Sequence, residues 1–186
     1  MDELDVIQEM KDAIQKGFPP SIRFPDELGL LCDWTEQNDY PISGYFELRA
    51  DDGDAIYWWF RSHAADDRLA QFGAGADGSL YCIWKQEDGR EPIVHMGSEG
   101  DALIVLARCM EEFITLLAVG YGEIGFEDLS ETPESQDDVN PKFQRWVEET
   151  FAVTVPTTGR AIVDRATQEH DDFAAFVNSV TEKEDG

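Results

Sequence analysis

Five short runs of aromatic and β-branched residues, separated by turn signals, most constrain how this chain can fold. The runs between Ile42 and Met96 are ISGYFELR, AIYWWF, LAQFG, SLYCIW and PIVHM. Residues of these types are typical of β-strands. Asp-Gly pairs favour tight turns between strands, and they occur here at Asp52-Gly53, Asp77-Gly78 and Asp88-Gly89. Because strands this close in sequence pair with their neighbours, we predict consecutive antiparallel strands.

Helical patterns lie on both sides of these runs. Before Gly17, which sits where a helix would end, apolar residues recur at helical spacing: Leu4, Ile7, Met10 and Ile14. A short helical or irregular piece is expected from Leu28 to Trp34. After the strands, ALIVLA (Ala102 to Ala107) is compatible with a sixth strand or with the start of a helix. The next segment, MEEFITLLAVG, predicts a helix that ends at Gly120.

The C-terminal part returns to helical patterns after a long acidic connection. Asn140 followed by Pro141 is typical of a helix N-terminus, and the helix it starts carries the apolar stripe Phe143, Trp146, Val147 and Phe151. A last helix or helix pair is expected from about Thr158 to Val180, with the apolar face Ile162, Ala166, Phe173, Phe176 and Val177. The order predicts an α+β fold, with a mostly antiparallel sheet flanked by N-terminal and C-terminal helices. We expect one domain over residues 1–186, in which residues 140–186 form a C-terminal helical extension.

The charge of the chain restricts its partners. Forty acidic residues against fourteen basic ones give a formal net charge of −26. Such a surface repels nucleic-acid phosphates and anionic membranes, because both need clusters of Lys and Arg to bind. It attracts basic proteins and accelerates association with them. The charge alone is equally compatible with a role in solubility or with a salt-rich habitat.

The sequence gives no sign of export. Its three cysteines, Cys32, Cys82 and Cys109, are sparse and odd in number, which fits a reducing compartment better than a disulfide scaffold. The N-terminal residues are acidic where a signal peptide needs positive charge, and no apolar run approaches the length of a membrane span. A cytoplasmic location is therefore expected.

Two motifs with chemical meaning are better explained as turns. GAGADG (Gly73 to Gly78) has the spacing of a dinucleotide-binding loop, but that loop needs a helix directly after it, and SLYCIW predicts a strand. ADDGDA (Ala50 to Ala55) lacks the central Gly and terminal Glu of a calcium loop. Both are interpreted as hairpin turns.

No catalytic constellation is recognisable. His63, His95 and His170 have no partner at metal-ligand spacing, and Ser98 lacks the motif of a nucleophile elbow. Cys109 could act with a histidine, although a buried or helix-entry thiol is the simpler interpretation. The sequence predicts a protein that is not an enzyme, with no catalytic residues, no cofactor and no metal.

Two regions are candidate partner surfaces. The connection from Glu111 to Asp138 holds nine acidic residues and no basic one, and we expect Glu123, Glu127, Asp128 and Glu131 to border a binding surface with Tyr121 and Phe126 as exposed anchors. The second region is the run around Trp58 and Trp59. If this run is a strand, its consecutive rings point to opposite sheet faces, and one face is either covered by the C-terminal helices or exposed as an aromatic patch.

The stretch FGAGADGSLYCIWKQEDGREPIVHMGSEGDALIVLARCMEEFITLLAVG resembles the SUKH superfamily, the Smi/Knr cell-wall-regulator-like group. The resemblance covers about Ile42 to Gly120 and rests on a glycine-rich turn, an aromatic strand, a P-[IV]-V strand, a G-S-E-G turn and a Phe-bearing helix that ends in Gly. It implies an antiparallel sheet flanked by helices. It also implies one of two roles, since bacterial members are immunity proteins that neutralise toxins, often nucleases, by direct binding, and eukaryotic members are regulatory scaffolds. The family brings no catalytic residues.

The expected function is therefore that of an acidic, non-catalytic binding protein. Our first hypothesis is an immunity protein whose partner is a basic toxin domain, and it draws on the charge as well as on the resemblance. The alternative is a regulatory or scaffolding module with a cellular partner. The sequence names neither the partner nor the oligomeric state.

Overall fold

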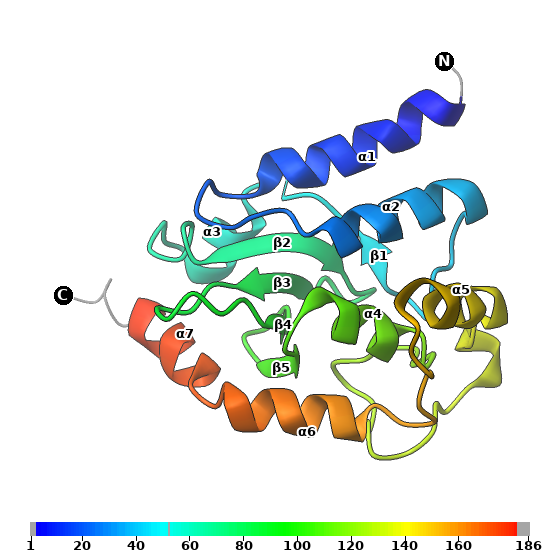
Figure 1. Ribbon diagram of the computed structural model, residues 1–186. Coiled ribbons are helices and arrows are strands. Elements are labelled where there is room, and N and C mark those ends of the chain that lie inside the picture. The colour runs from blue at the N-terminus through cyan, green and yellow to red at the C-terminus, as the bar shows by residue number, and fades with distance from the viewer. Residues whose placement is uncertain (1–2, 52, 182–186) are drawn as a thin grey trace.

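The computed structural model describes residues 3–51 and 53–181, and the protein has an α+β fold (Figure 1). The side chains of Leu4 and Ile7 and the expected turn residue Asp52 lie outside the described part. Within these limits, no helix is long and apolar enough to cross a membrane.

A five-stranded antiparallel sheet forms the centre of the fold. Its strands are β1 (Glu47–Leu48), β2 (Leu69–Ala74), β3 (Leu80–Trp84), β4 (Ile93–Met96) and β5 (Ile104–Ala107), and they pair in sequence order. The predicted turns at Asp77-Gly78 and Asp88-Gly89 are confirmed, and each glycine has a φ of +86°, a conformation that favours glycine. Since a strand follows GAGADG, the hairpin interpretation of that motif is confirmed.

One of the predicted strands is wrong, and another is much shorter than expected. AIYWWF forms a helix, α3 (Ala55–Phe60), so Gly53 precedes a helix and not a second strand of a hairpin. Ile56 and Phe60 are buried four residues apart, which is the spacing of one helix face, and the rings of Trp58 and Trp59 do not alternate across a sheet. Of ISGYFELR, only Glu47–Leu48 pairs as a strand. ALIVLA, left open by the sequence, contains β5.

Four helices cover one face of the sheet. They are α1 (Glu3–Gly17), α2 (Asp26–Asn38), α4 (Met110–Leu117) and α5 (Pro141–Phe151). Together with the sheet residues Phe72 and Tyr81 they enclose the larger core, in which Phe113 and Phe143 are fully buried. Asn140 caps α5 as expected, because its side chain accepts hydrogen bonds from the N–H groups of the second and third helical residues at 3.1 Å. The stripe of α5 packs inward.

The opposite face carries a smaller core. It is covered by α3 and α7 (Phe173–Thr181), while α6 (Arg160–Glu169) runs along β5. Trp84 on β3 is 1% exposed and packs against Phe173 and Phe176 of α7, with ring centroids 5.0 and 5.4 Å away. The predicted apolar faces of the last two helices are confirmed, and α6 contributes to both cores through Ile162 and Ala166.

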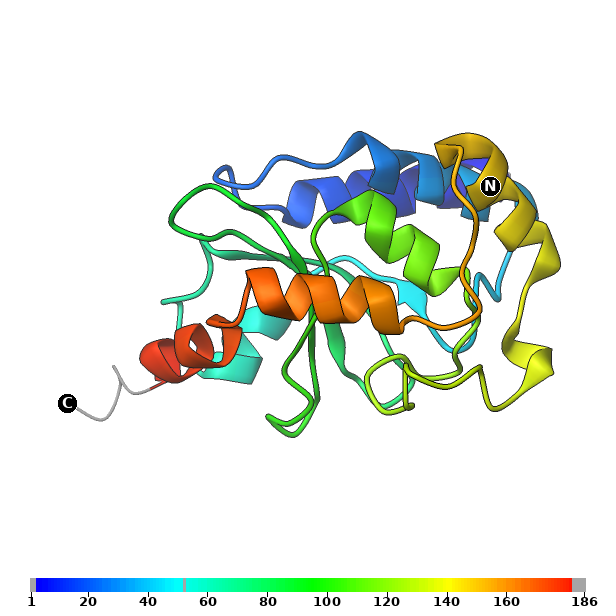
Figure 2. The ribbon, with the colours of Figure 1, turned by 60° about the horizontal axis from the view of Figure 1, so that its bottom comes forward.

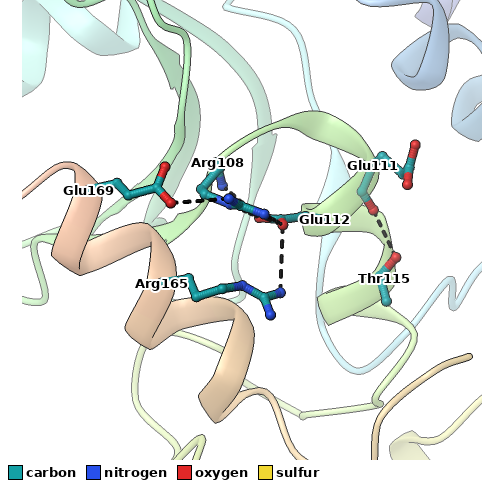
Figure 3. Close-up of polar contacts among 6 residues, drawn as sticks. All are labelled: Arg108, Glu111, Glu112, Thr115, Arg165 and Glu169. Carbon is teal, nitrogen blue, oxygen red and sulfur yellow. Dashed lines mark hydrogen bonds and ion pairs between the residues drawn. The ribbon is translucent and has the colours of Figure 1, made fainter. Parts of the chain in front are cut away.

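An ion-pair network attaches α6 to the start of α4 (Figure 3). Arg108 pairs with Glu112 and, at 3.1 Å, with Glu169, and Arg165 lies 3.6 Å from Glu112. Although its partial burial acts in the opposite direction, the hydrogen bonds and charge of Arg108 lower the pKa of Glu112. The network therefore ties the C-terminal helices to the end of the sheet strand β5.

Candidate functional site

The acidic connection meets two hairpin turns at one end of the sheet. We call this region the acidic end, and it consists of the β2–β3 turn (75–79), the β4–β5 turn (97–101) and the segment 121–138. The N–H of Ala76 donates to Glu123 at 3.2 Å, and the Ser98 hydroxyl lies 3.5 Å from the Asp77 carboxylate. Figure 2 shows the β4–β5 turn and the segment after α4 along the same lower side of the molecule.

The acidic end carries ten carboxylates and no Lys, Arg or His in its own three segments. They are Asp77, Glu99, Asp101, Glu123, Glu127, Asp128, Glu131, Glu134, Asp137 and Asp138. One cation, Arg160 at the start of α6, acts on this segment, because its charge helps to lower the pKa of Asp128. Like charges gathered in this way repel one another unless salt or a cationic partner offsets them.

Three of the four predicted carboxylates also hold the segment in shape. Glu127 accepts hydrogen bonds from the N–H groups of Glu123 (3.0 Å) and Glu134 (3.4 Å). Asp128 accepts from the N–H and hydroxyl of Ser130, at 2.9 and 2.6 Å. Glu123 accepts from the β2–β3 turn, as described above. Glu131 is exposed, and its carboxylate makes no ion pair or hydrogen bond with the described chain.

The electrostatics of this end differ from one carboxylate to the next. Burial and the charges of Asp77 and Glu127 raise the pKa of Glu123, because both effects disfavour its ionised form. The hydroxyl and N–H of Ser130 lower the pKa of Asp128, since they bind its ionised form. Of Glu123 and Asp128, Glu123 is therefore the one whose ionised form is destabilised in the folded protein.

The expected exposure of Tyr121 is wrong. Its side chain is 1% exposed, and its hydroxyl donates to the carbonyls of Leu129 (3.1 Å) and Glu131 (2.8 Å) and accepts from the N–H of Gly159 (2.8 Å). The neighbouring Gly120, with a φ of +98°, turns the chain after α4 so that the ring points into the core. Tyr121 is a structural residue of the acidic end and is not available as an anchor.

Phe126 is the exposed aromatic residue of this segment. It is 53% exposed and meets the ring of His95 edge to face at 5.8 Å. His95 is fully buried, its Nδ1–H donates to the carbonyl of Ala102 at 2.8 Å, and burial lowers its pKa. The ring of Phe126 therefore packs on a neutral imidazole, between two acidic turns.

Trp58 and Trp59 lie on α3, beside the β4–β5 turn. Trp59 is partly buried against the smaller core, and its indole N–H donates to the carbonyl of Gly97 at 2.8 Å. Trp58 is 56% exposed, with the Arg61 guanidinium 4.9 Å from its ring centre. Both line a cavity of about 560 Å³ with Leu103 and Val177. The structure thus brings this aromatic region close to the acidic end through the 97–101 turn.

A second cavity, which no pattern in the sequence indicated, lies next to the acidic end. Tyr40 and Tyr45, 48% and 59% exposed, line a cavity of about 490 Å³ together with Glu47 and the backbone of Gly75 and Gly78. The N–H of Tyr45 donates to the carbonyl of Gly122 at 3.0 Å, which joins the cavity to the segment 121–138. Two tyrosines beside Pro41 and Gly44 could have signalled an exposed loop, but the residues from Ile42 onward were assigned to a strand.

The histidines and cysteines do not form a reactive site. His63 pairs with Asp66, and His170 is buried against Gln86. Cys109 is exposed at the start of α4, where partial burial and the charges of Glu112 and Glu111 raise the pKa of its thiol and so oppose the reactive thiolate. Among the described residues, no group of three or more His, Cys, Asp or Glu could hold a metal ion.

Comparisons with protein-family models, with curated proteins and with solved structures found no match to this chain.

Proposed function

We propose that this protein is a non-catalytic binding protein, an immunity protein of the SUKH type that neutralises a basic bacterial toxin domain by direct contact. The observation that carries the proposal is the acidic end, where three segments far apart in sequence bring ten carboxylates together without a basic residue among them. Toxins that cleave nucleic acid must present Lys and Arg to phosphate. An acidic surface of this kind covers such a site and competes with its substrate.

The binding surface is proposed to include Glu123, Glu127, Asp128, Glu131 and the exposed ring of Phe126. Aromatic side chains at the centre of a polar rim are typical anchors of protein interfaces. Glu127 and Asp128 accept hydrogen bonds from their own segment and Glu123 accepts one from the β2–β3 turn, so these three carboxylates are held in place before a partner arrives. The aromatic region around Trp58 and Trp59 is the second candidate surface, and the shared turn 97–101 allows one partner to contact both.

The experiment first reads the neighbouring reading frame, where the immunity role requires a toxin gene, and then measures the binding rate with the toxin domain encoded there. Stopped-flow association of the two purified proteins should be fast at low salt and should slow steeply as salt is raised. The variant Glu131→Lys, Glu134→Lys, Asp137→Lys should associate at least about tenfold more slowly, because it reverses three charges at the acidic end. These three carboxylates are exposed and hold no backbone group, so the fold is retained.

The matched control reverses three charges at the other end of the sheet. Asp67, Glu87 and Asp171 are also exposed, and their change to Lys alters the net charge by the same amount. This control should associate nearly as fast as the wild type. Equal slowing by both variants would mean that only net charge matters. If the wild type does not bind the toxin domain but captures a cellular protein, the regulatory or scaffolding alternative replaces the immunity role.

A further inference from the structure

The cavity between Tyr40 and Tyr45 has the chemistry of a cation-binding pocket. Two exposed aromatic rings flank it, and Glu47 lines it. The β2–β3 turn forms another wall through Gly75, Ala76 and Gly78. Aromatic rings attract cations through their electron-rich faces, and carboxylates nearby add to that attraction.

The tyrosine rings of this pocket differ from the exposed ring of Trp58 in whether a cation of the chain lies over them. On α3, the Arg61 guanidinium already lies over the ring of Trp58. In the residues that the structure describes, the two cation–ring contacts involve Trp58 and Phe176, and neither involves Tyr40 or Tyr45. The tyrosine rings are thus open to a cation from outside the chain.

The one basic side chain that lines the pocket is already paired. Arg49 lies 3.3 Å from Glu47, in an ion pair whose side chains are both more than half exposed. An exposed pair of this kind contributes little to stability, so an incoming cation can replace Arg49 at the Glu47 carboxylate at small cost. On the far wall, Glu123 holds the N–H of Ala76, which fixes the turn against the pocket.

We propose that this pocket binds an arginine side chain of the basic partner, with its guanidinium stacked on Tyr45 and paired with the Glu47 carboxylate. The inference rests on the proposed function, because it names the partner group that the acidic end receives. Arginine fits better than lysine, since its planar guanidinium stacks on aromatic rings and binds carboxylates through two parallel hydrogen bonds.

The test uses the acetylated and amidated tetra-arginine peptide as the probe and needs no toxin. In an NMR titration at low salt, the arginine δ-methylene protons should move upfield, because they come to lie over a tyrosine ring. Tyr45→Ala should remove this shift and weaken binding about twofold to fivefold, the range for a cation–ring contact at an exposed site. Tyr45→Phe should retain both, since it keeps the ring.

Leu30→Ala is the matched control, because Leu30 is also an exposed apolar side chain, at 43% against 59% for Tyr45, and lies on α2 outside both candidate surfaces. It should leave the upfield shift and the affinity unchanged. The proposal is overturned if the peptide does not bind, if it binds without the upfield shift, or if Tyr45→Ala binds as the wild type does. Loss of the shift in Trp58→Ala in place of Tyr45→Ala would move the arginine site to α3. A positive result with this peptide and no binding of the toxin domain would leave the pocket standing and reject the immunity role.

Discussion

The two ends of the sheet differ in how their charged residues are paired. At the end formed by the β3–β4 turn and the junction of α6 and α7, which we call the paired end, cations have partners within the chain. Arg90 binds the Asp88 carboxylate at 2.7 Å and the carbonyl of Glu169 at 3.1 Å, and Arg108 binds the Glu169 carboxylate. At the acidic end, ten carboxylates gather without a basic residue in the same segments.

This contrast bears on the meaning of the net charge. A chain that is acidic only to remain in solution has no reason to leave ten carboxylates at one end of a sheet without a basic residue in the same segments. Here the C-terminal helices use the paired end as their attachment, and the opposite end is left with an uncompensated negative field. We therefore expect mutations at the paired end to change stability and mutations at the acidic end to change association.

The largest expected effect comes from truncating one aromatic residue at each end. Trp84→Ala should lower the free energy of unfolding by about 3–5 kcal/mol, because its buried indole packs on two rings of α7. Phe126→Ala, at an exposed site, should cost less than about 1 kcal/mol. Urea denaturation measures both. If both variants lost a similar amount of unfolding free energy, the acidic end would contribute as much to stability as the paired end. The contrast between the two ends would then be wrong.

A smaller effect is expected for the ion-pair network. Glu112→Gln should lower the free energy of unfolding by about 1–3 kcal/mol, because the partly buried carboxylate of Glu112 binds Arg108 and lies near Arg165. Glu131→Gln, the matched change at the acidic end, should stay within about 0.5 kcal/mol of the wild type. Chemical denaturation at low and at moderate salt checks this difference, and a neutral result for Glu112→Gln would show that apolar contacts alone attach α6.

Within the acidic end, replacing a carboxylate that accepts a backbone hydrogen bond should lower stability more than replacing one that does not. Glu127→Ala should cost about 1 kcal/mol, since the N–H of Glu123 then loses its acceptor. Glu134→Ala should leave stability unchanged within error. For the same reason, reversal of Glu127 and Asp128 to Lys disturbs the segment itself, so it is a poor test of binding. Thermal melts of the single variants measure the difference.

The smallest effect is a pH dependence. The pKa of Glu123 is raised in the folded protein, so its contribution to stability is present at low pH and is lost as pH rises through that raised pKa. Glu123→Gln should therefore flatten the stability profile just above the ordinary glutamate pKa, with a change below about 1 kcal/mol. Asp128, whose pKa is lowered, contributes with the opposite sign. A profile in which Glu123→Gln parallels the wild type would show that Glu123 is not strained by its neighbours.

The sheet was predictable because its signals are local. β3 and β4 carry β-branched and aromatic residues, and the two Asp-Gly turns separate β2 from β3 and β3 from β4. Turn chemistry of this kind acts within four residues. AIYWWF failed because an apolar run of six has no period, and only the burial of Ile56 and Phe60 with the exposure of Trp58 reveals the helix. Helix α2, from Asp26 to Asn38, is longer than the predicted piece.

The candidate site was predictable only in its charge. The acidic connection is visible in the sequence, but its meeting with the turns at Asp77 and Ser98 depends on sheet pairing. The burial of Tyr121 depends on Gly159, 38 residues away. Tyr45 was missed because the pattern ISGYFELR favours a strand, whereas in the fold only two of its residues pair. Tyr40 lies before this run, and no pattern in the sequence pointed to it.

The three hydrogen bonds of the Tyr121 hydroxyl have a consequence for the thermodynamics of recognition. They connect residues 129, 131 and 159 at a single buried atom, so the segment that carries the acidic surface keeps one conformation before any encounter. Ordering a free loop on binding would lose about 1–2 kcal/mol of conformational entropy for each residue fixed. In this protein the segment loses that conformational entropy when the chain folds. In Tyr121→Phe the segment would be less ordered before binding, so part of the entropy would be lost on binding and the binding entropy would be less favourable.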